Sequence, residues 1–335
     1  MTFRALRIKE TSAGQFERNI ELLNLEDLPA GELLIRVHYS SLNYKDALSA
    51  SGNKGITRNY PHTPGIDAAG VVEISRTEEF AVNDEVIVTG FDLGMNTDGG
   101  MADYIRVPAA WAMKKPQAFT LMETMAIGTA GLTAAAAVYK MQLMGQVPQA
   151  GPIVVSGATG GVGSFSIAIL ASQGFEVIAV SGKNEAKDYL NHLGATKVSP
   201  RSLINDNSSK FLIRPSWAGA IDTVGGNTLN TLLKGCKAEG SVVSTGLVDS
   251  PQLNTTVYPF ILNGVNLLGI GSAETPMETR KILWDKLGSD YVVKDKIHTI
   301  AKEVSLEEVG TCMNTMLDGK LIGRIVVRLV QTGLT

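Results

Sequence analysis

The sequence has few cysteines and no pattern of them that suits a metal or a disulfide framework. Its two cysteines, Cys236 and Cys312, are far apart and match neither zinc-ligand nor redox-pair spacing. We interpret both as small buried apolar side chains and expect a reducing cytoplasmic environment.

The sequence also lacks an excess of charge of one sign and any apolar run that we judge long enough to span a bilayer. Its 30 basic and 33 acidic residues give a net charge of −3, which argues against a nucleic-acid partner. The Ala-rich run at 132–138 is too short for a membrane helix, and residues 1–6 are typical of a strand rather than a signal peptide. A length of 335 residues favours two domains in an ordinary globular enzyme.

The order of the expected elements changes near residue 151. Before it, short apolar runs are separated by Gly, Pro, Asn and Asp, which predicts an antiparallel, barrel-like domain. These strands are expected at 3–9, 32–40, 68–74, 85–90 and 101–107, followed by helix over 121–140 with breaks near Gly128 and Gly131. After it, strands alternate with helices, which predicts a parallel, doubly wound sheet. Those strands are expected at 152–156, 176–180, 196–199, 218–223, 240–244 and 266–269.

The last part of the chain is expected to return to the first domain. The pattern predicts a helix at 275–287, a strand near 296–300, a helix at 306–317 and a final strand at 323–329. We therefore expect an α/β protein in which residues 1–125 and 272–335 form the barrel-like domain. Residues 126–271 are expected to form the nucleotide-binding domain.

A glycine-rich block, Ser156 to Gly163, lies between an expected strand and an expected helix. Gly157 permits a tight turn, and Gly160 and Gly161 let backbone N–H groups approach a pyrophosphate. Gly163 allows close packing of the helix on the strand, and the N-terminus of that helix favours phosphate. In this context the block predicts a dinucleotide site.

The second strand of this unit ends at Ser181 and Lys183 without an acidic residue. An Asp or Glu there would hold the ribose 2′-OH of NAD, whereas Ser181 and Lys183 suit a 2′-phosphate. Arg201, after the third strand, could close the same pocket. These residues could equally be a helix cap and solvated surface cations. The missing acid leads us to favour NADP(H) over NAD(H).

Several motifs resemble the medium-chain dehydrogenase/reductase superfamily over essentially the whole chain. The most specific are Ser40 to Leu48, Pro64 to Gly70 and Ala218 to Gly225; further matches are 127–131, 156–163 and 259–262. Within that superfamily the chain resembles the zinc-free quinone oxidoreductase branch and its acryloyl-CoA reductase group. The resemblance implies a GroES-like β-barrel catalytic domain and a Rossmann NADP-binding domain.

The zinc enzymes of this superfamily have Cys and His ligands that this sequence lacks. The segment Asn43 to Asp46 has no Cys, Gly65-Ile66-Asp67 has no His, and two cysteines cannot form a four-Cys lobe. His62 is a lone imidazole that we interpret as structural. We predict no metal site, and hydride addition to an activated alkene or a quinone.

Candidate catalytic residues lie in the two most specific N-terminal motifs. Asn43 and Tyr44 are expected to face the substrate, where the Tyr44 hydroxyl could donate to an oxyanion or relay a proton; a packing role is an equal alternative. Asp67 could act through water or Tyr44, or could hold a loop. Asp46 is more plausibly structural, and Arg324 could pair with one of these carboxylates.

The resemblance implies further cofactor contacts, one residue at a time. They are Tyr44, Thr159, Gly160, Gly161, Val162, Ser181, Gly182, Lys183, Arg201, Leu247, Ile261 and Ser272. Thr129 is added as a candidate hydrogen-bond partner of the nicotinamide amide. The family often has Arg where this chain has Lys183, and the loss of the bidentate fork could weaken selectivity for NADPH.

The leading hypothesis is NADPH-dependent reduction of acryloyl-CoA to propionyl-CoA. Lys54 and Arg58 lie in a loop suited to CoA phosphates, although loop charges are common. The first alternative is an NADPH:quinone oxidoreductase, and a non-enzymatic crystallin-like or RNA-binding role is a remoter one. A cytoplasmic homodimer is expected, formed through the strand that begins at Asn266.

Overall fold

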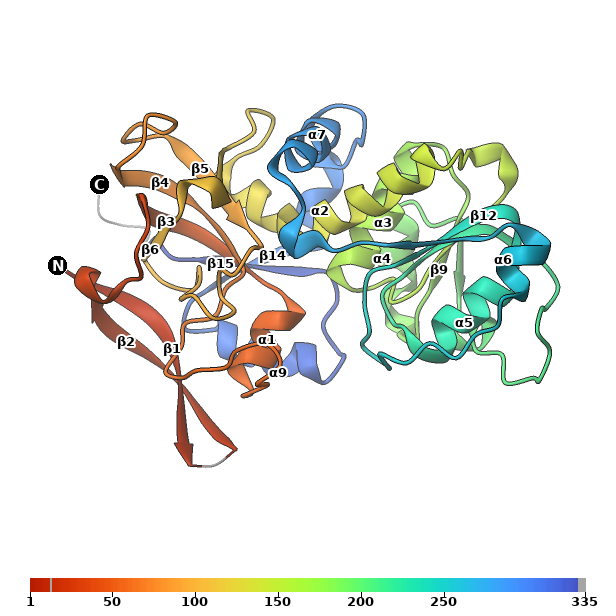
Figure 1. Cartoon of the computed structure of the whole chain (residues 1–335), viewed down its shortest axis with the longest axis horizontal. Helices are drawn as coiled ribbons and strands as arrows, with labels where there is room; N and C mark the ends of the chain where they lie inside the picture. The colour runs from red at the N-terminus through yellow and green to blue at the C-terminus, as the bar shows by residue number, and fades with distance from the viewer. Residues whose placement is uncertain (13, 331–335) are drawn as a thin grey trace. The chain divides into compact units, whose positions relative to one another are not determined.

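The computed structural model describes residues 1–12 and 14–330, which divide into two compact units (Figure 1). Unit 1 comprises Met1–Thr129, Ala273–Lys281 and the chain from Ala301 onward. Unit 2 comprises Ala130–Ser272 and Ile282–Ile300. Each unit has its own sheet and its own buried apolar core.

Unit 1 is built mainly from antiparallel strands. A hairpin of β1 and β2 forms a two-stranded sheet, and a seven-stranded sheet has the order β14-β15-β3-β4-β5-β7, with β6 paired to β3. The strands are β1 (Thr2–Ser12), β2 (Gln15–Asn24), β3 (Leu33–Leu42), β4 (Asp67–Ser75), β5 (Glu85–Thr89), β6 (Tyr104–Val107), β7 (Ala112–Lys114), β14 (Ala301–Ser305) and β15 (Arg324–Arg328). Strand β15 pairs with β3, Ile325 opposite Leu42, which confirms the expected return of the chain. Helices α1 (Tyr44–Ala50) and α9 (Val309–Leu317) pack together in this unit.

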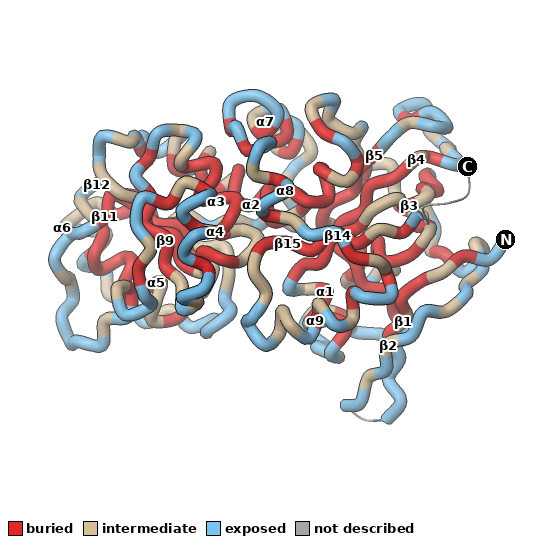
Figure 2. Tube along the Cα trace, turned by 180° about the vertical axis from the view of Figure 1, so that it is seen from behind, coloured by how far each residue is buried: buried red, intermediate tan, exposed pale blue. Residues whose placement is uncertain are grey.

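Unit 2 is a six-stranded parallel sheet with the order β10-β9-β8-β11-β12-β13. Its strands are β8 (Ile153–Val155), β9 (Val177–Val180), β10 (Lys197–Ser199), β11 (Trp217–Asp222), β12 (Cys236–Ser244) and β13 (Asn266–Gly269). Its helices include α3 (Gly161–Ser172), α4 (Lys187–His192), α5 (Gly226–Lys234) and α6 (Tyr258–Asn263). Strands β8, β9 and β11 are buried along their whole length, as Figure 2 shows for β9 and β11. This is the doubly wound order in which the first and fourth strands are neighbours and ligands bind beyond their carboxyl ends.

One expected element is wrong and two strands were not expected. Residues 296–300 do not form a strand: α8 (Ile297–Ile300) is helical, and β14 begins one residue later. Ile297 and Ile300 are both buried, and their i, i+3 spacing places them on one helical face. Strands β2 and β7 have mixed polar sequences, and β2 is mostly exposed, so neither has the apolar alternation that would reveal it.

The segment Ile282–Ile300 lies in unit 2, whereas the sequence assigned it to the first domain. The buried Tyr291 donates its O–H to Gln142 Oε1 at 2.7 Å, and Gln173 Nε2 donates to the carbonyl of Asp290 at 2.8 Å. These bonds attach the segment to helices of unit 2. Helix α7 (Met277–Gly288) contains the point at which the chain passes from one unit to the other.

Helix α2 (Leu121–Leu143) is interrupted at Gly128, where φ is +48° and ψ is −156°. This confirms the break expected there. The helix is long and apolar enough to cross a bilayer by length and composition, contrary to our expectation that no run would be. Of its most apolar window 83% is buried inside the protein, which is typical of a core helix.

Candidate functional site

The glycine-rich turn joins β8 to α3 and is built on close backbone contacts. Gly157 has a φ of +54°, a conformation that L-residues with side chains rarely adopt. A Cβ on Gly163 would lie 2.5 Å from the carbonyl oxygen of Gly157 and 2.8 Å from Ala158 Cα. Gly160 is the N-cap of α3, and the free N–H groups of its first turn can bind an anion. The geometry thus fits the separate roles expected for these glycines: a tight turn at Gly157, an open helix N-terminus at Gly160 and close helix packing at Gly163.

A buried carboxylate fixes the ends of the two central strands. Asp222, the last residue of β11, accepts a hydrogen bond from Ser156 Oγ at 2.5 Å and from the N–H of Gly225 at 2.7 Å. Burial raises the pKa of Asp222, while these hydrogen bonds oppose the rise. Thr223 Oγ1 donates to the carbonyl of Ser156 at 3.2 Å. The loops after β8 and β11 are thus tied together where a dinucleotide would lie.

The residues expected to read the 2′-phosphate come together in unit 2. Ser181 Oγ accepts the N–H of Lys183 at 3.0 Å, and Lys183 Nζ donates to Thr159 Oγ1 at 3.2 Å. A Cβ on Gly182 would lie 2.9 Å from Arg201 Nε, so glycine lets Arg201 approach the loop. Burial lowers the pKa of Lys183, Glu185 opposes this, and Arg201 lowers it further.

The other expected cofactor residues of unit 2 lie on or near its sheet ends. Leu247 follows β12 and is 62% exposed, and Ile261 on α6 is 69% exposed. Ser272 follows β13 and begins a short 3-10 helix. Gly161 and Val162 are in the first turn of α3 and half-buried.

Asp67, at the start of β4, is the centre of a buried polar cluster in unit 1. Its Oδ2 accepts hydrogen bonds from Ser41 Oγ at 2.7 Å, Asn43 Nδ2 at 2.8 Å and the N–H of Thr129 at 3.0 Å. Its Oδ1 accepts the hydroxyl of Thr129 at 2.6 Å. The Thr129 backbone N–H and side-chain O–H are therefore both donated to Asp67, which places Thr129, the candidate partner of the nicotinamide amide, within this cluster.

Arg324 completes this cluster from β15 and is almost fully buried. Its Nη2 lies 3.6 Å from Asp67 Oδ2, and its Nη1 donates to Asn43 Oδ1 at 2.8 Å. The expected pairing of Arg324 with a carboxylate is thus present. Burial lowers the pKa of Arg324, whereas Asp67 and Asp46 raise it. Both the nitrogen and the oxygen of the Asn43 side-chain amide are hydrogen-bonded, so this side chain links Asp67 to Arg324.

Asp46 connects this cluster to the start of α1. Its Oδ2 accepts the N–H of Asn43 at 2.7 Å, and its Oδ1 accepts the N–H groups of Gly65 and Ile66 at 3.0 and 2.9 Å. These bonds fit the structural role expected for Asp46. Complete burial raises its pKa to about 7, and the three backbone donors oppose that rise.

Tyr44 is the first residue of α1 and is 37% exposed. Within residues 1–12 and 14–330, no side chain or backbone group takes a hydrogen bond from its hydroxyl. Tyr44 is thus the candidate catalytic side chain with a polar atom left for a ligand. Asp46 holds the backbone N–H of Asn43, the residue before Tyr44, and Asp67 holds the Asn43 side chain.

Sequence reasoning did not include Ser41, although Ser41 Oγ also accepts a hydrogen bond from Arg324 at 2.8 Å. A serine in the expected strand before Asn43 cannot be recognised from the sequence as a member of the cluster around Asp67. Of the two loop cations, Lys54 pairs with Glu10 at 2.7 Å and lies 4.6 Å from the Tyr60 ring centre. Arg58 is exposed.

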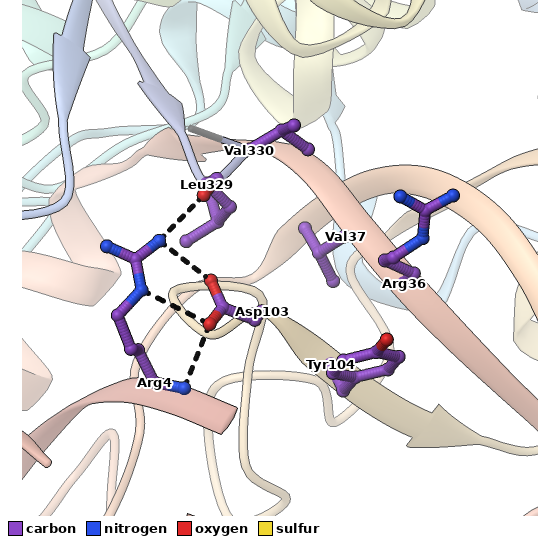
Figure 3. Close-up of a pocket in the computed structure, with 7 residues that line it drawn as sticks. All are labelled: Arg4, Arg36, Val37, Asp103, Tyr104, Leu329 and Val330. Carbon is purple, nitrogen blue, oxygen red and sulfur yellow. Dashed lines mark hydrogen bonds and ion pairs between the residues drawn. The ribbon is translucent and has the colours of Figure 1, made fainter. Parts of the chain in front are cut away.

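A separate pocket of about 370 Å³ lies in unit 1 (Figure 3). Arg4 is held there by both carboxylate oxygens of Asp103, at 3.0 and 3.2 Å, and by the carbonyl of Leu329 at 2.8 Å. The other lining residues are Arg36, Val37, Tyr104 and Val330. None of the expected site residues lines this pocket, so we do not assign the reaction to it.

Comparison with known families agrees with this division of the chain. Residues 29–117 match the alcohol dehydrogenase GroES-like domain, and residues 161–304 match the model described as zinc-binding dehydrogenase. The fold and the glycine turn define a two-domain, dinucleotide-dependent oxidoreductase. The chain belongs to the medium-chain dehydrogenase/reductase family, and the expected GroES-like and Rossmann folds are confirmed.

Three bacterial proteins are similar to this chain over nearly its whole length. "Putative quinone oxidoreductase YhfP" of Bacillus subtilis is 41% identical over 98% of this chain and 99% of its own. Acrylyl-CoA reductase AcuI of Ruegeria pomeroyi is 40% identical over 97% and 98%. The structure of Escherichia coli YhdH with bound NADPH has a TM-score of 0.94 and 40% identity, and covers 97% of this chain and 100% of that one. The YhfP structure, with NAD bound, also has a TM-score of 0.94, at 42% identity over 98% and 100%.

The family description mentions zinc, whereas the residues here do not assemble a zinc site. In the part of the chain that the structure describes, no three His, Cys, Asp or Glu side chains gather closely enough to hold a metal ion. The region of Asn43 and Asp67 is filled by a carboxylate, an amide, hydroxyls and a guanidinium. A dinucleotide, in contrast, fits the glycine turn, because α3 begins after its N-cap Gly160 without a side-chain cap and the N–H groups of its first turn suit phosphate oxygens.

Proposed function

We propose that this enzyme uses NADPH to reduce the C=C bond of a short α,β-unsaturated acyl-CoA, with acryloyl-CoA as the reference substrate. The observation that carries the proposal is the exposed Tyr44 hydroxyl on a backbone fixed by Asp46, Asn43 and Asp67. The likeness to AcuI supports the substrate class. The absence of an acidic residue at the end of β9, where Ser181 and Lys183 stand with Arg201 beside them, supports NADPH.

When bound, NADPH supplies a hydride to the β-carbon of the conjugated alkene. The protein then has to stabilise negative charge on the thioester oxygen and deliver a proton to the α-carbon. We assign the hydrogen bond to that oxygen to the Tyr44 O–H. Asp67, Asn43 and Arg324 act as positioning residues, because their polar atoms bond to one another and to Ser41 and Thr129.

A quinone is the second candidate substrate, favoured by the likeness to YhfP. Both substrates accept a hydride and develop an oxyanion, so the same residues would act on either. We place the enzyme in the cytoplasm as a homodimer paired through the edge strand β13.

Steady-state kinetics with NADPH, acryloyl-CoA and a benzoquinone test this proposal. We expect kcat/KM to be higher for acryloyl-CoA, and methacrylyl- or crotonyl-CoA would define the acyl pocket. A much higher kcat/KM for the quinone would replace the leading proposal by the second one. No hydride transfer to either acceptor would reject both.

A further inference from the structure

We propose that Thr159, in the pyrophosphate-binding turn, is a positioning residue that sets the selectivity for NADPH by holding Lys183. The inference rests on the proposed use of NADPH and adds to it a coupling between two parts of the cofactor site. The observation behind it is the hydrogen bond of 3.2 Å from Lys183 Nζ to Thr159 Oγ1.

The two residues come from different strand ends of unit 2. Thr159 follows β8 in the glycine turn, two residues before α3 begins, and is 6% exposed. Lys183 follows β9, and its backbone N–H is already fixed by Ser181 Oγ at 3.0 Å. The hydrogen bond therefore joins the loop expected to bind the pyrophosphate to the loop expected to bind the 2′-phosphate.

The surroundings explain why Lys183 needs such a contact. Arg201 is close enough to lower the pKa of Lys183, so the two cations repel each other. A lysine is a flexible point charge and cannot form the bidentate fork by which an arginine fixes its own position. A hydroxyl acceptor at Thr159 keeps the ammonium near Arg201, where a dianionic phosphate can bind both.

Thr159 can serve both loops because its hydroxyl both accepts and donates. It accepts the hydrogen from Lys183, and no residue within the described ranges accepts the O–H of Thr159. That O–H can donate to a pyrophosphate oxygen while its oxygen holds the lysine. Selectivity for the 2′-phosphate then depends on a residue outside the loop expected to contact it.

The test measures dissociation constants for NADPH and NADH by nucleotide fluorescence, without substrate. Thr159→Val removes the hydroxyl at nearly constant volume. We expect it to lower the preference for NADPH over NADH about 2- to 10-fold, the effect of one hydrogen bond. Thr159→Ser, which keeps the hydroxyl, should restore the wild-type preference.

A double-mutant cycle separates positioning from direct contact. In the Lys183→Ala background, Thr159→Val should leave the NADPH/NADH preference unchanged, because no ammonium remains to be held. Tyr189→Phe is a matched control: it removes the hydrogen bond of Tyr189 to Ser164 Oγ, 2.7 Å long, in the same unit, and leaves both Lys183 and Thr159 unchanged. Its preference should equal that of the wild type.

Three results would overturn the inference. An equal loss of affinity for both nucleotides in Thr159→Val would reduce Thr159 to a pyrophosphate contact. A further fall in preference in the Lys183→Ala background would show an effect independent of the lysine. A preference that rises in Thr159→Val would show that Thr159 competes with the phosphate for Lys183. If Lys183→Ala itself leaves the preference unchanged, the NADPH assignment to Lys183 fails as well.

Discussion

At the scale of single residues, the Tyr44 hydroxyl and the Asp67 carboxylate of unit 1 have different surroundings. Asp67 accepts four hydrogen bonds and lies beside Arg324, so its oxygens are occupied. A buried carboxylate that accepts this many hydrogen bonds is fixed in place. Tyr44, in contrast, keeps an exposed hydroxyl on a fixed backbone. The residue that we propose to face the substrate is thus different from the residues that hold this part of unit 1 in place.

We predict that Tyr44→Phe lowers kcat for acryloyl-CoA about 100-fold, the usual effect of removing one hydrogen-bond donor to a developing oxyanion. The dissociation constant for NADPH should change little. Stopped-flow measurement of NADPH oxidation checks this. Tyr39→Phe, at a half-buried position on strand β3, is the control and should retain activity. Unchanged kcat in Tyr44→Phe would leave Tyr44 as a packing residue.

Asp46 gives a prediction for the pH dependence of stability. Burial raises its pKa in the folded protein to about 7, against about 3.9 in an unfolded chain. Between these values the folded protein binds a proton that the unfolded chain does not. The free energy of unfolding should therefore fall as pH rises from about 4 to about 7, by up to ~1.4 kcal/mol per pH unit.

Denaturant unfolding of the wild type and of Asp46→Asn over this pH range provides the measurement. The variant has no titrating group at this position. The free energy of unfolding of the wild type minus that of Asp46→Asn should therefore shrink or change sign as pH rises. Above about pH 7 and below about pH 4 the difference should be constant. A difference that is flat from pH 4 to pH 8 would contradict the raised pKa.

At the scale of elements, the β8–α3 turn of unit 2 is tightly constrained. Three features meet in it: the positive φ of Gly157, the close approach at Gly163 and the ties from Ser156 to Asp222 and Thr223. Because the neighbours of Gly163 are backbone atoms, they cannot move aside as a flexible side chain would.

We predict that Gly163→Ala destabilises unit 2 by ~1–3 kcal/mol, through the shift of the turn that the added methyl requires. NADPH affinity should fall at least tenfold, because the same N–H groups are expected to bind the pyrophosphate. Thermal melting with and without NADPH measures both effects. Gly310→Ala on α9 is the control: nothing lies within 4 Å of the added Cβ, and stability should stay equal or rise.

At the scale of the whole molecule, strand β13 is one of the two edge strands of the unit 2 sheet, the other being β10. Strand β13 pairs with β12 on one side, and Leu267 in it is 38% exposed. An edge strand offers unpaired backbone groups to a second copy of the chain. This is the basis of the homodimer that we propose.

We predict that Leu267→Lys converts the dimer to a monomer, because two lysines would face each other across a twofold edge pairing. Light scattering after size-exclusion chromatography measures the mass. Leu22→Lys, at a 70% exposed position on β2, is the control and should remain dimeric. A wild-type protein that is monomeric at all concentrations would reject the proposed interface.

The sequence predicted unit 2 better than unit 1, for a physical reason. Parallel strands buried on both faces are short apolar runs, and the glycine turn has a fixed spacing, so both are visible locally. Strand β2 is an exposed hairpin strand with charged residues, and α8 contains β-branched isoleucines that suggest a strand. In both cases burial decided the structure, and burial depends on the rest of the fold.

The sequence by itself determined the dinucleotide turn, the lack of an acid after β9, and the lack of Cys and His at the zinc-ligand positions. These are properties of residue type and short spacing. Only the tertiary structure decided that Ser41, Asn43, Thr129 and Arg324 surround Asp67, and that Thr159 holds Lys183. Those partners are distant in the chain, and a buried charge takes its partners from whichever groups the fold brings within hydrogen-bond distance.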